Sequence, residues 1–180
     1  QLFLAGIHVA VFLVSAYLLL KELFAWDGTA VLALALFLTV DLLCIDEIFS
    51  MSRLQWTLPQ EFGLYTQFLC ALFLLRCLKT DFSDRSGSRR ERFRKFLTDE
   101  NLLLFLLSLA ASIAIHFYVT MMAFFLCVVI AACRFPSLFQ KGRFVSLVKA
   151  VCLGVLIAVL PMGIAYAKGV PFQGSIGWAV

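Results

Sequence analysis

Residues able to assist a group transfer stand at two places in an otherwise apolar chain. Asp46 and Glu47 lie together near the end of an apolar stretch, and Arg53 follows Asp46 by seven residues. A carboxylate can act as a general base, taking a proton from a hydroxyl group whose oxygen attacks an activated donor. Two adjacent acids are also common at the polar end of a helix that has no catalytic role. In that case Arg53 would be an ion-pair partner. Both interpretations stay open.

His116 and Tyr118 form the second place. They interrupt a run of apolar residues that extends over 101–133. A histidine at this position can bind a phosphate or stabilise a leaving group, and the neighbouring tyrosine can help to hold a substrate. We therefore treat both residues as candidate substrate contacts.

The length of the 101–133 run decides how these residues are positioned. One helix of that length would be roughly 50 Å long, whereas the hydrocarbon core of a bilayer is about 30 Å thick. Two short helices with a tight turn at residues 116–120 fit better. The turn would place His116 and Tyr118 at one end of a helical hairpin.

The composition is that of an integral membrane protein, with 63% hydrophobic and 14% charged residues. Soluble domains average about 45–50% and about 25%. We predict an all-α polytopic bundle that forms a single region over residues 1–180. Because an apolar stretch starts at the second residue, we expect this region to be a piece of a larger membrane protein. The expected spans are 2–20, 29–48, 62–79, 101–115, 118–133 and 145–167, with a cytoplasmic basic loop at 80–100.

The distribution of Lys and Arg predicts the orientation in the lipid bilayer. Basic residues collect in short cytoplasmic loops, so the loop 80–100 and the connector 134–143 are expected inside. Two spans between the loop and the connector place both segments inside, whereas one long helix would place the connector outside. The segments 55–61 and 169–180 are then outside, together with Asp46, Glu47 and His116.

The basic stretch leaves two alternatives. Residues 89–97 could form a short amphipathic helix on anionic headgroups, with Phe93 and Phe96 pointing down, or a solvated basic loop. Either way the stretch marks topology and is no nucleic-acid site, since no folded basic domain surrounds it.

Other chemistry finds little support. The six cysteines lie within or at the ends of spans, without CxxC spacing or a neighbouring histidine, so no metal site is expected. His8, inside the first span, is expected to be satisfied by neighbouring helices. No Gly-rich phosphate loop, HExxH or GxSxG pattern is present.

The stretch Ile113-Ala114-Ile115-His116-Phe117-Tyr118-Val119-Thr120-Met121-Met122 resembles a motif of large bacterial membrane proteins of the GT-C type. It is most similar to the family linked to glycosylation of lipoteichoic acid and related envelope polymers. That family has a small–apolar–(Asn or His)–Phe–Tyr pattern followed by a methionine-containing span. The resemblance implies a multi-pass cell-membrane glycosyltransferase that uses a polyprenyl-phosphate-linked sugar at the outer face. It also implies an acid at Asp46 or Glu47 and a donor contact at His116.

Three other functions remain as alternatives. A polysaccharide polymerase or ligase would use outer arginines to bind phosphate, and Arg53 is the candidate. A transporter or flippase would have polar residues along a mid-membrane path and inverted repeats, and neither is evident. A non-catalytic anchor or sensor would carry a soluble domain elsewhere in the protein.

Overall fold

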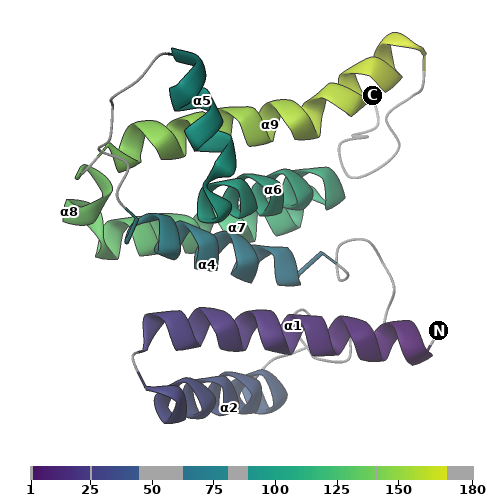
Figure 1. The fold of residues 1–180 in the computed structure, drawn as a ribbon. Coiled ribbons are helices and arrows are strands. Elements are labelled where there is room, and N and C mark those ends of the chain that lie inside the picture. The colour runs from purple at the N-terminus through teal and green to yellow at the C-terminus, as the bar shows by residue number, and fades with distance from the viewer. Residues whose placement is uncertain (1, 25, 45–62, 81–88, 141, 170–180) are drawn as a thin grey trace.

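The computed structural model describes residues 2–24, 26–44, 63–80, 89–140 and 142–169, and within these ranges the chain is helical apart from short turns. The all-α prediction is confirmed for this part of the chain. The helices, labelled in Figure 1, are α1 (Leu2–Leu23), α2 (Asp27–Cys44), α4 (Tyr65–Cys77), α5 (Arg89–Thr98), α6 (Glu100–Ile115), α7 (Phe117–Cys133), α8 (Phe135–Leu138) and α9 (Arg143–Ala167).

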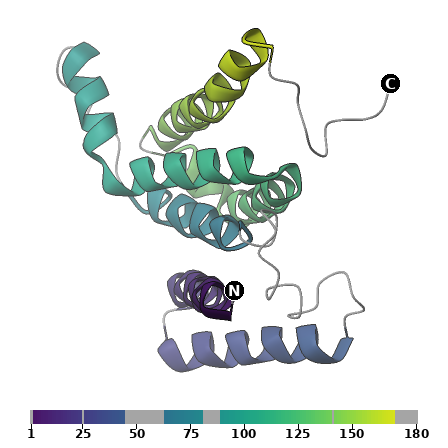
Figure 2. The ribbon, with the colours of Figure 1, turned by 90° about the vertical axis from the view of Figure 1, so that its right-hand side faces the viewer.

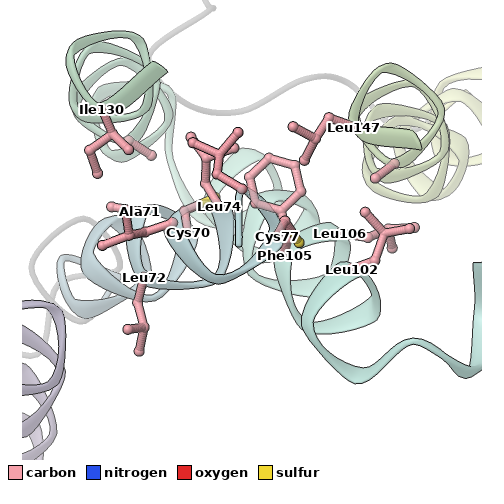
Figure 3. Packing of buried hydrophobic residues seen from close by; sticks show 14 of the residues in the cluster. Cys70, Ala71, Leu72, Leu74, Cys77, Leu102, Phe105, Leu106, Ile130 and Leu147 are labelled. Atoms are coloured by element: carbon pink, nitrogen blue, oxygen red, sulfur yellow. The ribbon is translucent and has the colours of Figure 1, made fainter. Parts of the chain in front are cut away.

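Helix α4 is the centre of the molecule. It packs against α1, α6 and α7, and α9 packs on α6. Eight of its thirteen residues are buried, so nearly every face of the helix meets a neighbour. Figure 3 shows α4 residues such as Ala71 and Leu74 between Ile130 of α7 and Leu147 of α9. Helix α2 lies on the outer side of α1, away from this core (Figures 1 and 2).

Two polar residues divide the chain between 89 and 133 into three helices. The Asp99 carboxylate accepts a hydrogen bond from the Leu102 amide at 2.9 Å and so caps the start of α6. His116 ends α6 with an extended backbone, φ −165° and ψ 140°. The 101–133 run is therefore two helices, as predicted, but the break is a single residue rather than a turn over 116–120. Helix α7 then runs back toward α8 (Figure 1).

The basic stretch forms a helix rather than a loop. Helix α5 covers nearly the predicted residues, and Phe96 packs against the buried core while Arg90 and Arg94 are exposed. Of the two alternatives for this stretch, the helix is the one observed, but its Phe96 faces the core of the protein and not lipid as expected.

Among the described residues, two helices are long and apolar enough to cross a membrane, through the segments Gly6–Leu23 and Arg143–Ala167. The second continues through Pro161 to Ala167. Other apolar helices are shorter, with 13 residues in α4, 16 in α6 and 17 in α7. At 1.5 Å per residue, α7 is roughly 26 Å long, less than the core of about 30 Å. Each predicted span overlaps a helix, but length and composition single out two of them as candidate spans.

The two ends of the molecule differ in charge. The chain has 15 Lys and Arg residues. All of them lie in the segments 76–95 and 134–149 except Lys21, Arg53 and Lys168. In Figure 1 the end of α1, the end of α4 and the start of α9 lie on the left, while the α6–α7 break and the end of α9 lie on the right.

Side-chain contacts hold the basic end together. Glu22 of α1 accepts a hydrogen bond from Arg76 Nε of α4 at 3.1 Å and forms a second ion pair with Lys79. An exposed pair, Lys21 with Asp27 at 3.1 Å, joins α1 to α2. Cations of this end are therefore partly balanced by acids from α1 and α2.

Large apolar side chains are exposed over much of the surface. They include Phe124, Phe125, Val128 and Val129 of α7, and on α9 they continue from Phe144 to Tyr166. Soluble monomers rarely expose contiguous apolar patches above a few hundred Å². The outer faces of α7 and α9 are thus suited to a lipid or protein environment rather than to water.

Candidate functional site

The candidate site that the structure describes is the break between α6 and α7. Among the residues predicted from the sequence, His116 and Tyr118 lie there. Asp46, Glu47 and Arg53 fall within residues 45–62, outside the described part of the chain.

His116 caps α7 with its own side chain. Its Nδ1 accepts a hydrogen bond from the Tyr118 amide at 3.1 Å. A neutral imidazole that accepts through Nδ1 carries its proton on Nε2, so the second ring nitrogen is a hydrogen-bond donor. The residue that ends one helix thus starts the next.

Tyr118 meets His116 through its backbone and not through its phenol. The side chains of Phe117 and Tyr118 are 62% and 39% exposed, so both point away from the core. The structure therefore brings the two predicted residues together only in the capping hydrogen bond. An outward tyrosine beside an apolar ring is typical of residues at a membrane–water interface.

Thr120 and Ser112 complete the break and were not predicted as site residues. The Thr120 hydroxyl donates to the Ser112 carbonyl at 3.0 Å and to the His116 carbonyl at 3.2 Å. The His116 amide also donates to the Ser112 carbonyl at 3.3 Å. A threonine four residues after a candidate helix start is a weak sequence signal for such a bond, because its hydroxyl often reaches the i−4 carbonyl.

These bonds satisfy backbone groups that a helix end leaves open. The last carbonyls of α6 and the first amides of α7 have no partner within their own helices. Ser112 is completely buried, and its hydroxyl donates to the Leu109 carbonyl at 2.8 Å. His116 is consequently held in one backbone conformation, with fixed groups on both sides.

Helix α2 ends on the same side of the molecule as the break. In both Figure 1 and Figure 2, α2 runs from its junction with α1 toward the side where α6 gives way to α7. Its last residue, Cys44, precedes the segment that contains Asp46 and Glu47. His8 of the neighbouring helix α1 is buried.

The cysteines at positions 70, 77, 127, 133 and 152 are free thiols. Cys70 and Cys77 are buried in α4, and no group of three or more His, Cys, Asp or Glu residues within the described ranges is placed to hold a metal ion. No family model matches this chain, and no curated protein and no solved structure matches it either.

Proposed function

We propose that this chain is the membrane region of a polytopic GT-C-type glycosyltransferase with six spans. It transfers a sugar from a polyprenyl-phosphate carrier to an envelope glycan or polymer outside the cell. The observation that carries the proposal is the hairpin break at His116, located at the opposite end of the molecule from the basic helix ends. By the positive-inside rule, the break is then on the outer face.

The exposed apolar surface supports six spans although α4, α6 and α7 are short. Helix α4 is enclosed by α1, α6 and α7, so its length need not match the lipid. Helices α6 and α7 are a few Å shorter than the hydrocarbon core, a mismatch that local thinning and interfacial side chains accommodate at modest cost. A multi-pass location in the cell membrane follows from this arrangement.

The catalytic part of the proposal rests on the resemblance of residues 113–122 to the GT-C motif. Asp46 or Glu47 would take the proton of the acceptor hydroxyl. The acceptor oxygen would bond to the anomeric carbon of the sugar while the bond from that carbon to the phosphate oxygen breaks, and the carrier leaves as polyprenyl phosphate. His116 would donate a hydrogen bond from Nε2 to this phosphate, with Tyr118 and Arg53 as further substrate contacts. A hydrogen bond to a charged phosphate is shorter and about twice as strong as one between neutral groups.

The capping geometry of His116 allows a sharp test. Asparagine can cap a helix with its oxygen and still donate through its amide, which agrees with the Asn-or-His position in the family pattern. Aspartate caps equally well and is favoured by the helix dipole, but it donates nothing and repels a phosphate. His116→Asn and His116→Asp are therefore a matched pair that separates folding from substrate contact.

The experiment compares these variants in the full protein, expressed in cells that lack the native copy. We expect both to accumulate in the membrane, His116→Asn to retain sugar transfer, and His116→Asp to lose it by roughly tenfold or more. The double change of Asp46 and Glu47 to alanine should abolish transfer. The sugar content of the envelope polymers, measured by mass spectrometry, is the readout. Unchanged glycosylation in the double variant would remove the assignment of the base.

A further inference from the structure

Three phenylalanine rings form an exposed stack at the basic end. The rings of Phe135 and Phe139 are 5.0 Å apart at 65°, and those of Phe139 and Phe144 are 5.1 Å apart at 27°. The three side chains are 58%, 56% and 44% exposed. They belong to α8, to the residue that ends it and to the first turn of α9, at the far left of Figure 1.

A buried arginine holds this stack in place. Arg143 is only 6% exposed, and its Nε donates to the Thr80 carbonyl at 2.7 Å while Nη1 donates to the Ser137 carbonyl at 3.0 Å. The guanidinium thus joins the start of α9 to α8 and to the end of α4. Gly142, with φ 69°, supplies the left-handed turn that brings Phe144 back onto Phe139. The exposed rings are therefore presented by a fixed framework.

The chain segment that carries the stack is basic. Residues 134–149 contain Arg134, Lys141, Arg143 and Lys149 and no acidic residue. Arg134, directly before Phe135, is exposed and makes no ion pair within the described residues. Exposed aromatic rings beside an exposed arginine are complementary to a lipid interface, where acyl chains lie below a layer of phosphates.

We propose that α8 and the first turn of α9 form an interfacial anchor for anionic phospholipid. The rings of Phe135, Phe139 and Phe144 insert among the acyl chains of the inner leaflet, and Arg134 binds the phosphate of an anionic headgroup. Arg143 is a positioning residue that sets the depth of the rings and does not contact lipid. This anchor requires that the chain lie in a membrane, but it is independent of sugar transfer.

Photocrosslinking tests the anchor in the full chain. The probe p-benzoyl-phenylalanine replaces Phe139 in one variant and Phe125 in another. Phe125 is an equally exposed phenylalanine in the middle of α7 and serves as the control for lipid contact. The protein is reconstituted in vesicles of equal parts phosphatidylcholine and phosphatidylglycerol and irradiated, and the adducts are identified by mass spectrometry.

We expect lipid adducts from both probes. Adducts at position 139 should be enriched several-fold in phosphatidylglycerol, whereas those at position 125 should follow the composition of the vesicle. Arg134→Gln should bring the ratio at position 139 close to that composition. Lys168→Gln, at the opposite end of the molecule, should leave it unchanged. A probe at Phe135 should reproduce the result if the variant at Phe139 is poorly incorporated.

Two results would overturn the proposal. Crosslinks at position 139 to another protein molecule, with lipid adducts at position 125 alone, would make the stack a protein interface. Lipid adducts at position 139 without enrichment, and without any effect of Arg134→Gln, would remove the selective binding of anionic headgroups. Neither result bears on Asp46, Glu47 or His116, so the anchor and the glycosyltransferase fail independently.

Discussion

At the scale of single residues, His116 combines two tasks that sequence reasoning treats separately. Its extended backbone separates two helices, and its Nδ1 caps the second of them. The same cap fixes the tautomer and leaves the ring proton on Nε2. A residue that was singled out as a substrate contact is therefore also a structural element, and a simple alanine substitution would not distinguish the two roles.

The Thr120 hydroxyl should contribute more to the free energy of unfolding than the hydroxyl of a threonine within an uninterrupted helix. Thr120→Val keeps the shape but removes the donor that bonds the carbonyls of Ser112 and His116. We expect the free energy of unfolding to fall by about 1 kcal/mol, because a carbonyl at the break loses a partner. Thr39→Val is the matched control, since the Thr39 hydroxyl donates to the Ala35 carbonyl within an uninterrupted helix.

Denaturant unfolding of the purified protein in detergent measures this difference. Thr39→Val should change the stability by less than about 0.5 kcal/mol, as is usual for exposed sites. Equal losses in the two variants would mean that the Thr120 hydroxyl gives the break no special support.

At the scale of elements, α9 packs on α6 through a stripe of small residues. Ala150, Gly154 and Ala158 are buried and recur every fourth residue, so they share one face of the helix. A Cβ atom on Gly154 would lie 3.2 Å from the Leu106 carbonyl oxygen. Small residues of this kind allow close approach of helix backbones in membranes. No such stripe on this helix is predicted from the sequence.

Substitution of the two α9 glycines tests this contact. Gly154→Leu forces a side chain against the backbone of α6 and should destabilise the protein by about 1–3 kcal/mol. Gly163→Leu lies on the same helix, where a Cβ atom would meet nothing within 4 Å, and should be neutral or slightly stabilising because leucine favours helices. The midpoint of thermal unfolding in detergent is the measurement. If both variants unfold at the wild-type temperature, close packing at Gly154 contributes nothing.

At the scale of the whole molecule, the alternation of helix directions sets the two ends apart. The end with Glu22, Arg76 and Lys79 is held by ion pairs, whereas the other end carries the break at His116. If the chain spans the membrane six times, segments at these two ends face opposite compartments. The arrangement therefore makes a prediction about accessibility that needs no knowledge of the substrate.

Cysteine labelling in intact cells measures that accessibility. Phe117→Cys should react with a maleimide that cannot cross the bilayer, because position 117 is exposed at the break. Gln140→Cys, beside the phenylalanine stack, should react only after the cells are opened. The unmodified protein provides the background from its native cysteines. Reaction of position 140 alone from outside would invert the orientation, and the proposed outer site would be lost.

Much of the helical arrangement was predictable because it depends on local composition. In a lipid environment no water is present to bond the backbone N–H and C=O groups. An apolar run therefore forms a helix, which pairs these groups within the run. The 101–133 run was too long for one crossing, and His116 was the polar residue at which it divided. The basic helix α5 was one of two alternatives, and its Phe96 packs on the core.

The contacts of Arg143 were not predictable. Its sequence position predicts one more cytoplasmic cation of the connector, but the folded chain buries its guanidinium against the Thr80 carbonyl, 63 positions earlier. The predicted acids and Arg53 remain a hypothesis, since they lie outside the described residues.

By itself, the sequence determined the all-helical class, the place where the long apolar run divides and the separation of charge along the chain. Each of these depends on residues near one another in the sequence. Tertiary structure alone decided that α4 is central, that Gly154 lies against the backbone of α6 and that three phenylalanine rings pack together beside a buried arginine. Such contacts join segments far apart in the chain, and they form because distant apolar faces must share one core.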